Sequence, residues 1–167
     1  MRILAAVAMI ASLAACGKAA PDPDPAPAST QTPAATASKT APALDLQHMT
    51  YDEFSGLIEP GLGCSFQTGE DVLFVATAAM ESAEIAQGVA KLDGEPQVLT
   101  ANEQGGYEAL VDGATFASDS GLTLTVTRTS EEGTPGEIET TSWPAELLAT
   151  APDRAERRYT GGYSCGA

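Results

Sequence analysis

The sequence predicts a mainly β fold, a small antiparallel barrel or sandwich with one short helix at its N-terminal side. About eight short runs of β-forming residues follow Gly61 and are separated by turn signals, a spacing typical of small all-β domains. Residues 122–129 alternate leucine or valine with threonine, so one face of this strand is apolar and the other polar. The Asp93-Gly94 pair joins two β-forming runs and favours a type I′ hairpin turn, which needs positive φ at both central residues.

The one predicted helix covers residues 51–58. Thr50, followed three residues later by Glu53, has the form of a capping box at the start of a helix. The apolar residues that follow at spacings of three and four are Tyr51, Phe54, Leu57 and Ile58. The Pro-Gly pair at 60–61 ends the helix. We therefore expect two helical turns that lie with one apolar face on the domain.

The predicted strands are residues 62–66, 72–76, 89–92, 95–99, 114–117, 122–129, 138–143, 145–149 and 157–165. Pro96 lies in one of these runs, and because proline donates no backbone N–H it favours an edge position. Residues 131–136 contain two glycines and a proline and are expected to form a loop.

The first sixteen residues have the pattern of an export signal. Arg2 precedes an apolar run, residues 3–13, which is shorter than the roughly 20 residues that span a bilayer as a helix. The run leads into Leu13-Ala14-Ala15-Cys16, which resembles the lipobox of bacterial lipoproteins. The resemblance implies cleavage before Cys16, lipidation of its sulfur and acylation of its new amine. An ordinary signal peptide with a chance cysteine, or a buried core segment, is the alternative.

This resemblance also implies a domain organisation and a location. Residues 1–15 are expected to be the signal peptide, 16–45 the lipidated cysteine with a disordered Pro/Ala-rich linker, and 46–167 the β-rich globular domain. The linker has few bulky apolar residues to offset the entropic cost of ordering it. In lipoproteins an aspartate after the lipidated cysteine favours retention in the inner membrane. Gly17 at this position therefore implies an anchor in the outer membrane, facing the periplasm.

With Cys16 assigned to the lipid, two of the three cysteines remain, Cys64 and Cys165. An exported protein meets an oxidising environment, so we expect these two to form a disulfide between the first and last strands. A metal site or two free thiols are the alternatives. A zinc site needs more ligands than two distant cysteines and the single histidine supply.

The charge of the chain excludes some partners. The 167 residues include 23 acidic and 8 basic side chains, a formal net charge of -15. Such a charge argues against binding of nucleic acid and against electrostatic attraction to anionic lipid. It is suited to solubility, the interpretation we favour, or to binding a basic protein.

No pattern in the sequence predicts catalysis, a metal site or a cofactor. His48 is the only histidine and lies beside Met49 at the start of the domain, where we interpret it as a bystander. A nucleophile elbow, a calcium loop, a phosphate-binding loop and a Cys-x-x-Cys pair are all missing from the sequence. Arg154, Arg157 and Arg158 form the only basic cluster, which either pairs with nearby acids or recognises a carboxylate or glycan.

One stretch of the domain resembles a known family. Residues 112–116, Asp-Gly-Ala-Thr-Phe, followed by Gly-Leu-Thr-Leu at 121–124, are similar to the inhibitory loop and next strand of membrane-bound inhibitors of c-type lysozyme. In that family a loop serine and a lysine enter the lysozyme cleft. Asp112 stands at the position of the serine, and Thr127 or Arg128 at that of the lysine. The resemblance gives Asp112, Ser118 and Arg128 as candidate inhibitory residues and a basic lysozyme as the candidate partner.

The sequence thus predicts a membrane-anchored envelope lipoprotein whose non-enzymatic β domain has a binding or structural role. Inhibition of c-type lysozyme is the alternative function. The two differ in one visible feature: an inhibitor needs a protruding loop near Asp112 or Ser118, whereas a support module needs only short turns there.

Overall fold

The computed structural model describes residues 41–81, 83–136 and 138–166. The lipobox-like sequence with Cys16 and most of the expected linker lie outside the described residues. The helices and strands are β1 (Leu46–Gln47), α1 (Tyr51–Phe54), β2 (Leu62–Thr68), β3 (Asp71–Ala78), β4 (Gln87–Leu92), β5 (Glu95–Ala101), α2 (Gly106–Asp112), β6 (Thr115–Ala117), β7 (Thr123–Arg128), β8 (Thr134–Pro135), β9 (Thr140–Thr150) and β10 (Arg157–Gly166).

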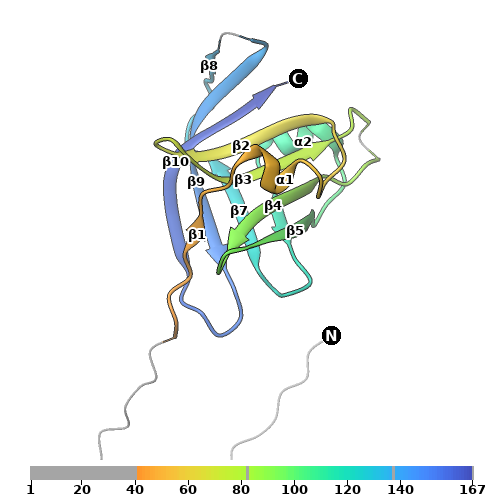
Figure 1. The fold of residues 1–167 in the computed structure, drawn as a ribbon. Helices are drawn as coiled ribbons and strands as arrows, with labels where there is room; N and C mark the ends of the chain where they lie inside the picture. Colours follow the sequence, from red (N-terminus) through yellow and green to blue (C-terminus); the bar gives the residue numbers. More distant parts are fainter. Residues whose placement is uncertain (1–40, 82, 137, 167) are drawn as a thin grey trace, which may run out of the picture. The chain divides into compact units, whose positions relative to one another are not determined.

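Eight of the strands close into an antiparallel barrel, which confirms the predicted fold class (Figure 1). Around the ring, each strand from β2 to β6 pairs with the next along the chain, β7 pairs with β9, β9 with β10, and β10 with β2. Two short strands lie beside this ring: β1 pairs with β4, and β8 pairs with β9. Such a meander needs only short connections, which agrees with the closely spaced turn signals of the sequence.

The disulfide between Cys64 and Cys165 is present and joins the first and last strands of the ring. The two cysteines are direct partners in the β2–β10 register, with their Cα atoms 4.0 Å apart. The covalent bond therefore lies at the seam where the barrel closes. The two-residue β1 precedes β2 in the chain but is not part of the ring.

Large side chains fill the interior of the barrel. The fully buried aromatic residues include Tyr163, Phe66, Phe74 and Phe116. The aromatic rings of Phe74 and Phe116 meet edge to face, with their centroids 4.9 Å apart. An eight-stranded barrel is just wide enough either for its side chains to fill it or for one small ligand. Here aromatic and leucine side chains occupy that space, so the binding surfaces considered below lie on the outside.

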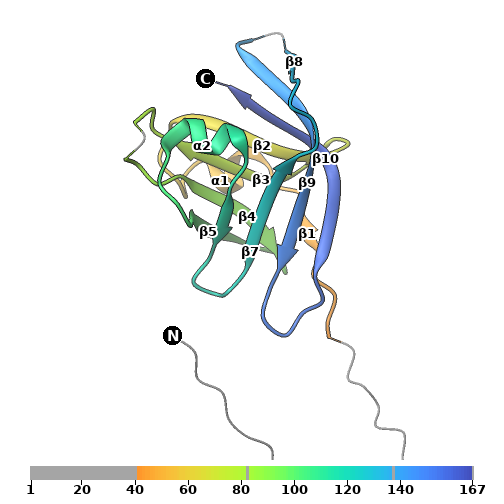
Figure 2. The ribbon, with the colours of Figure 1, turned by 180° about the vertical axis from the view of Figure 1, so that it is seen from behind.

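Helix α2 was not predicted from the sequence, and it lies near one end of the barrel (Figure 2). It connects β5 to β6 and contacts β2 and β3. Leu110 of α2 is fully buried, and its carbonyl oxygen accepts a hydrogen bond from the Tyr163 hydroxyl at 2.7 Å. Gly106 begins the helix with φ of 57°, where a Cβ would lie 2.3 Å from the Glu81 carbonyl oxygen. This close approach requires a glycine.

The N-terminal helix is shorter than predicted: α1 covers Tyr51–Phe54 instead of residues 51–58. After Phe54 the chain forms turns, but Ile58 remains buried as the apolar stripe predicted. Ile58 packs with Met49, Val75 and Val89 in a small second core on the outer face of β3 and β4. Phe54 and Ile58 of the predicted apolar stripe therefore face the domain, whereas Tyr51 and Leu57 are exposed, and the regular helical part is shorter than predicted.

Several other boundaries also differ from the sequence prediction. The two strands expected at 138–143 and 145–149 form one strand, β9 (Thr140–Thr150), which continues through Pro144. The carbonyl oxygen of Pro144 accepts a hydrogen bond from the Thr129 N–H, so Pro144 directs its nitrogen away from β10 and into the gap between the β7 pairing, which ends at Ala145, and the β8 pairing, which begins at Ser142. The expected loop at 131–136 contains β8. Leu44, two residues before the expected start of the domain, is already buried in the barrel core.

Candidate functional site

The structure brings together two of the three candidate inhibitory residues, Asp112 and Arg128. They lie at the ends of α2 and β7, and Arg128 Nη2 donates to Asp112 Oδ1 at 3.0 Å. The Arg128 guanidinium carbon also lies 4.9 Å from the centre of the Trp143 ring. Gly113, with φ of 97°, turns the chain directly after Asp112 into β6. Both contacts hold Arg128 against the barrel, because its charge is paired and its side chain packs on an aromatic ring.

The third candidate residue, Ser118, lies in a tight turn that directly follows β6, whereas Asp112 precedes this strand. The Ser118 N–H donates to the Leu122 carbonyl at 2.9 Å, and the Ser118 hydroxyl accepts from the Leu122 N–H at 3.1 Å. The hydroxyl also lies 2.8 Å from the Ser120 hydroxyl. Ser118 therefore holds a short turn together, and neither this turn nor the Asp112 end of β6 forms a long protruding loop.

A polar hollow of about 510 Å³ lies beside Asp112, between α2 and the strands β6 and β7. Asn102, Glu103, Thr115 and Thr125 are among its lining residues, and the two threonine hydroxyls are 3.0 Å apart. A smaller hollow of about 350 Å³ adjoins it, since both are lined by Asp112. The only cation that lines either hollow, Arg128, is already paired with Asp112.

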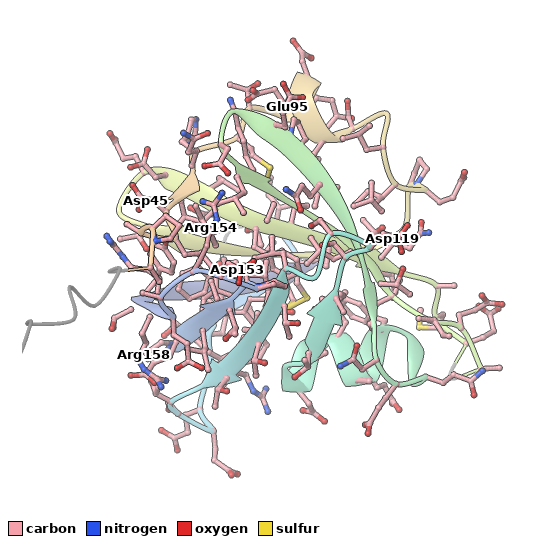
Figure 3. All side chains as sticks on the ribbon, turned by 90° about the horizontal axis from the view of Figure 1, so that it is seen from below. Asp45, Glu95, Asp119, Asp153, Arg154 and Arg158 are labelled. Atoms are coloured by element: carbon pink, nitrogen blue, oxygen red, sulfur yellow. A yellow bond between two sulfur atoms is a disulfide. The ribbon has the colours of Figure 1, made fainter. Side chains whose placement is uncertain are left out.

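The basic cluster predicted from the sequence pairs with acids, as the first of its two interpretations stated. Arg158 Nη1 lies 3.0 Å from Glu146 Oε2, Arg157 Nη2 lies 3.5 Å from Asp45 Oδ1, and Arg154 pairs with Asp93. Figure 3 shows the end of the barrel where Arg154, Arg158 and Asp45 lie. The hydrogen bond from Arg154 to Asp93 raises the pKa of that guanidinium.

Every lysine and arginine in the described part of the chain has an acidic partner within 4.0 Å. The remaining two pairs are Arg128 with Asp112 and Lys91 with Glu53. Because acids greatly outnumber bases, many carboxylates of the domain have no cationic partner among the described residues. The surface is therefore strongly acidic, and an uncharged region on it stands out.

Such an uncharged region is a groove of about 520 Å³ on the outside of the barrel, here called the Tyr51 groove. Helix α1 contributes Tyr51 and Phe54, and the seam strands β2 and β10 contribute Gly63, Ser65 and Ser164. None of its lining residues is charged. Tyr51 is 71% exposed, and its ring contacts that of Phe54 edge to face with centroids 5.4 Å apart. A smaller hollow of about 200 Å³ also includes both rings, so the two aromatics separate two depressions.

The position of α1 beside this groove is held by Glu53. Lys91 Nζ of β4 lies 2.5 Å from Glu53 Oε1, and the Thr50 N–H donates to Glu53 Oε2 at 2.8 Å. The second contact is the glutamate half of the predicted capping box. The bond from Lys91, followed by the one from Thr50, lowers the pKa of Glu53 from 4.5 to about 2.

The sequence did not point to the Tyr51 groove. Tyr51 and Phe54 were interpreted as part of one apolar stripe, and no sequence pattern singled out Ser65 or Ser164. A usable signal was present in the alternation of the two seam strands, where glycine or serine occupies every second position: Gly63 and Ser65 in β2, Gly162, Ser164 and Gly166 in β10.

His48 makes a structural contact. Its Nδ1 accepts a hydrogen bond from the Val72 N–H at 3.1 Å and lies 3.6 Å from Asp71 Oδ1. This contact fastens the segment after β1 to the start of β3. Across the described ranges, no group of three or more His, Cys, Asp or Glu side chains is arranged to hold a metal ion.

Comparison with known proteins assigns no family. A scan of protein-family models and searches of curated proteins and of solved structures found no match to this chain. Among the described residues there is no helix of the length and hydrophobicity needed to cross a membrane.

Proposed function

We propose that this protein is an envelope lipoprotein: acyl chains on Cys16 anchor it in the outer membrane, and its barrel is a non-enzymatic binding or structural module facing the periplasm. The observation that carries the proposal is the Cys64–Cys165 disulfide. It occupies the other two of the three cysteines, so Cys16, which ends the lipobox-like sequence, is the cysteine available for lipid. A disulfide also fits an oxidising compartment outside the cytoplasm.

The barrel supports a role based on its outer surface. Its interior is filled by buried aromatic and leucine side chains, which leaves a small ligand no space among them. The hollow beside Asp112 is lined by the carboxylates of Glu103 and Asp112, and Arg128, which lines the smaller adjoining hollow, is already paired with Asp112. His48 is bonded to the backbone. These arrangements favour recognition by surface contacts over acid–base or nucleophilic chemistry, which needs a positioned base near a reacting group.

The alternative function, inhibition of a c-type lysozyme, receives less support from the geometry. Asp112 and Ser118 flank opposite ends of β6, and the turn at Ser118 is short and internally hydrogen-bonded. Arg128, at the position of the family's lysine, is held by Asp112 and Trp143. The strongly acidic surface is the remaining feature that fits a basic lysozyme.

Lipidation is tested by expressing the full chain in a Gram-negative host and following the incorporation of radiolabelled palmitate. We expect label in the wild-type protein and its recovery with the outer membrane, whereas Cys16→Ser should carry no label and remain soluble. A Cys64→Ser/Cys165→Ser double variant is the matched control and should still be labelled. Unlabelled wild-type protein in the soluble periplasmic fraction would contradict the proposed anchor.

The alternative is tested separately with the full chain carrying Cys16→Ser and a hen-type lysozyme. We expect no inhibition in a lytic assay. Inhibition that is lost on Asp112→Ala or Arg128→Ala would instead make the barrel an inhibitor and would leave the anchor unaffected.

A further inference from the structure

We propose that the Tyr51 groove is a binding site for a neutral oligosaccharide, with one pyranose ring stacked on Tyr51 and its hydroxyls bonded to the seam strands. The inference gives a ligand to the binding module of the proposed function, but it depends on the geometry of the barrel and not on the lipid. The volume of about 520 Å³ lies within the range of small-molecule sites, about 300–1,000 Å³.

The first argument is charge. The domain carries a large excess of carboxylates, and yet no acidic or basic residue lines this groove. Binding an anion here would work against the surrounding negative field, and a cation would have no partner in the groove itself. A neutral ligand meets neither cost, and because it lacks charge it must be held by stacking and hydrogen bonds.

The second argument is the exposed aromatic ring. Tyr51 is 71% exposed, although Phe54, the other apolar residue of the same helix, packs against the barrel. Its edge-to-face contact with Phe54 orients the ring, and most of the Tyr51 side chain remains accessible to solvent. One face of a pyranose ring is made of C–H groups, which stack favourably on the electron-rich face of an aromatic ring. An exposed, oriented tyrosine beside a groove is therefore suited to a sugar ring.

The third argument is the chemistry of the seam strands. Ser65, Gln67 and Ser164 of these strands, together with Thr140 of the adjoining β9, line the groove with hydroxyls and an amide, which can each donate and accept. Sugar hydroxyls have the same dual character, so these groups match them without any charge. The side chains are already ordered: Gln67 Nε2 donates to the Ser65 hydroxyl at 3.1 Å, and the Ser164 and Ser142 hydroxyls are 2.5 Å apart.

The fourth argument is that the groove is preformed. The disulfide lies among its lining residues and fixes the two seam strands that form it. On the other side, Lys91 and Thr50 hold Glu53 and so hold α1. A site whose two sides are fixed before binding loses less entropy when the ligand arrives.

The test is titration of the ¹⁵N-labelled full chain carrying Cys16→Ser with chitohexaose and, separately, with maltohexaose, followed by amide NMR. We expect saturable shifts at the amides of Gly63, Ser65 and Ser164 with at least one of these neutral sugars, and little dependence on salt. A hexamer of glucosamine, which is cationic, serves as the charge control. Shifts with this cationic sugar alone, removed by salt, would overturn the proposal and assign binding to the acidic surface.

Three variants locate the site. Tyr51→Ala is expected to weaken binding about tenfold through the loss of stacking. Gly63→Val should block the groove, since the nearest atom to a Cβ there is 3.6 Å away and the added side chain has space to fold into it. Leu57→Ala is the matched control, because Leu57 is 45% exposed in the same segment but does not line the groove.

Absence of shifts with both neutral sugars at millimolar concentration, or affinity unchanged by Tyr51→Ala, would overturn the saccharide site. The amide spectrum of each variant shows directly whether its barrel is folded. Neither result bears on palmitate labelling of Cys16, so failure of this inference and failure of the proposed anchor are distinguishable.

Discussion

Tyr163 donates a buried hydrogen bond to the carbonyl oxygen of Leu110 and thereby joins the last barrel strand to the helix near the barrel end. Tyr163→Phe removes only this hydroxyl. We expect it to lower the free energy of unfolding by about 0.5–1.5 kcal/mol, the usual net value of one hydrogen bond. Urea denaturation measures the difference. Tyr51→Phe is the control and should leave the stability unchanged, because the Tyr51 side chain is largely exposed.

The same tyrosine makes the stability sensitive to alkali. Burial raises the pKa of Tyr163 above the ordinary value of 10.0, and burial also raises the pKa of Tyr107 and Tyr159. Above pH 10 the unfolded chain releases the tyrosine protons while the folded chain retains them, so unfolding becomes more favourable as pH rises. Tyr163 should contribute a loss of about 1.4 kcal/mol per pH unit.

Urea unfolding of the wild type and of Tyr163→Phe between pH 9 and pH 11 checks this expectation. The wild type should lose stability more steeply than the variant above pH 10. Parallel pH profiles of the two proteins would mean that Tyr163 ionises equally easily in both states.

At acidic pH, the stability of the domain should depend on the ionisation of Glu53. Its pKa is lowered from 4.5 to about 2 by the bonds from Lys91 and Thr50. This stabilising contribution is complete above the unfolded pKa of 4.5 and is lost as the pH falls towards 2. We therefore expect the wild type to be more stable than Glu53→Gln at pH 6 and the two to converge near pH 2.

Urea unfolding at several acidic pH values measures this convergence. Glu59→Gln, an exposed acid close to the same helix, is the matched control and should follow the wild-type profile. A difference in the free energy of unfolding between the wild type and Glu53→Gln that did not change with pH would show that the variant loses a packing contact and not a charge interaction.

The disulfide should be the largest single contribution to stability. It closes a loop with a sequence separation of 101 residues, for which the loop-entropy model gives about 4–5 kcal/mol. Cys64→Ser/Cys165→Ser should lower the free energy of unfolding by an amount of this order. The control is Cys16→Ser, which leaves the disulfide in place, compared with and without reductant. Equal stability of the oxidised and reduced forms would contradict the expectation.

Much of the barrel could be predicted from local patterns, and its exceptions have local causes. The 93–94 turn has Asp93 and Gly94 at φ of 56° and 85°, as the type I′ hairpin requires. Helix α2 was missed because it is short and bounded by glycines, although Tyr107, Leu110 and Val111 have helical spacing. Pro144 was interpreted as a break because the sequence does not show that it falls between two pairing segments of β9.

The candidate groove depended on information that no local pattern contains. The helical periodicity placed Tyr51 and Phe54 on one face of a helix. It did not show that Tyr51 lies at the edge of this face, where its side chain remains exposed. Ser65 and Ser164 are direct partners only because β2 and β10 pair at the closure of the barrel. The disulfide between the neighbouring cysteines was predictable, and from it the meeting of these two serines could have been inferred.

Arg128 provides a final prediction, because it packs on the single tryptophan of the chain. Arg128→Ala removes the guanidinium that lies 4.9 Å from the Trp143 ring centre, so water should reach the ring and its fluorescence emission should shift to longer wavelength. Asp112→Asn removes only the ion pair, and since Asp112 is 74% exposed, the stability should fall by less than about 1 kcal/mol. If Asp112→Asn moved the emission as far as Arg128→Ala does, the ion pair and not the stacking would hold Arg128 in place.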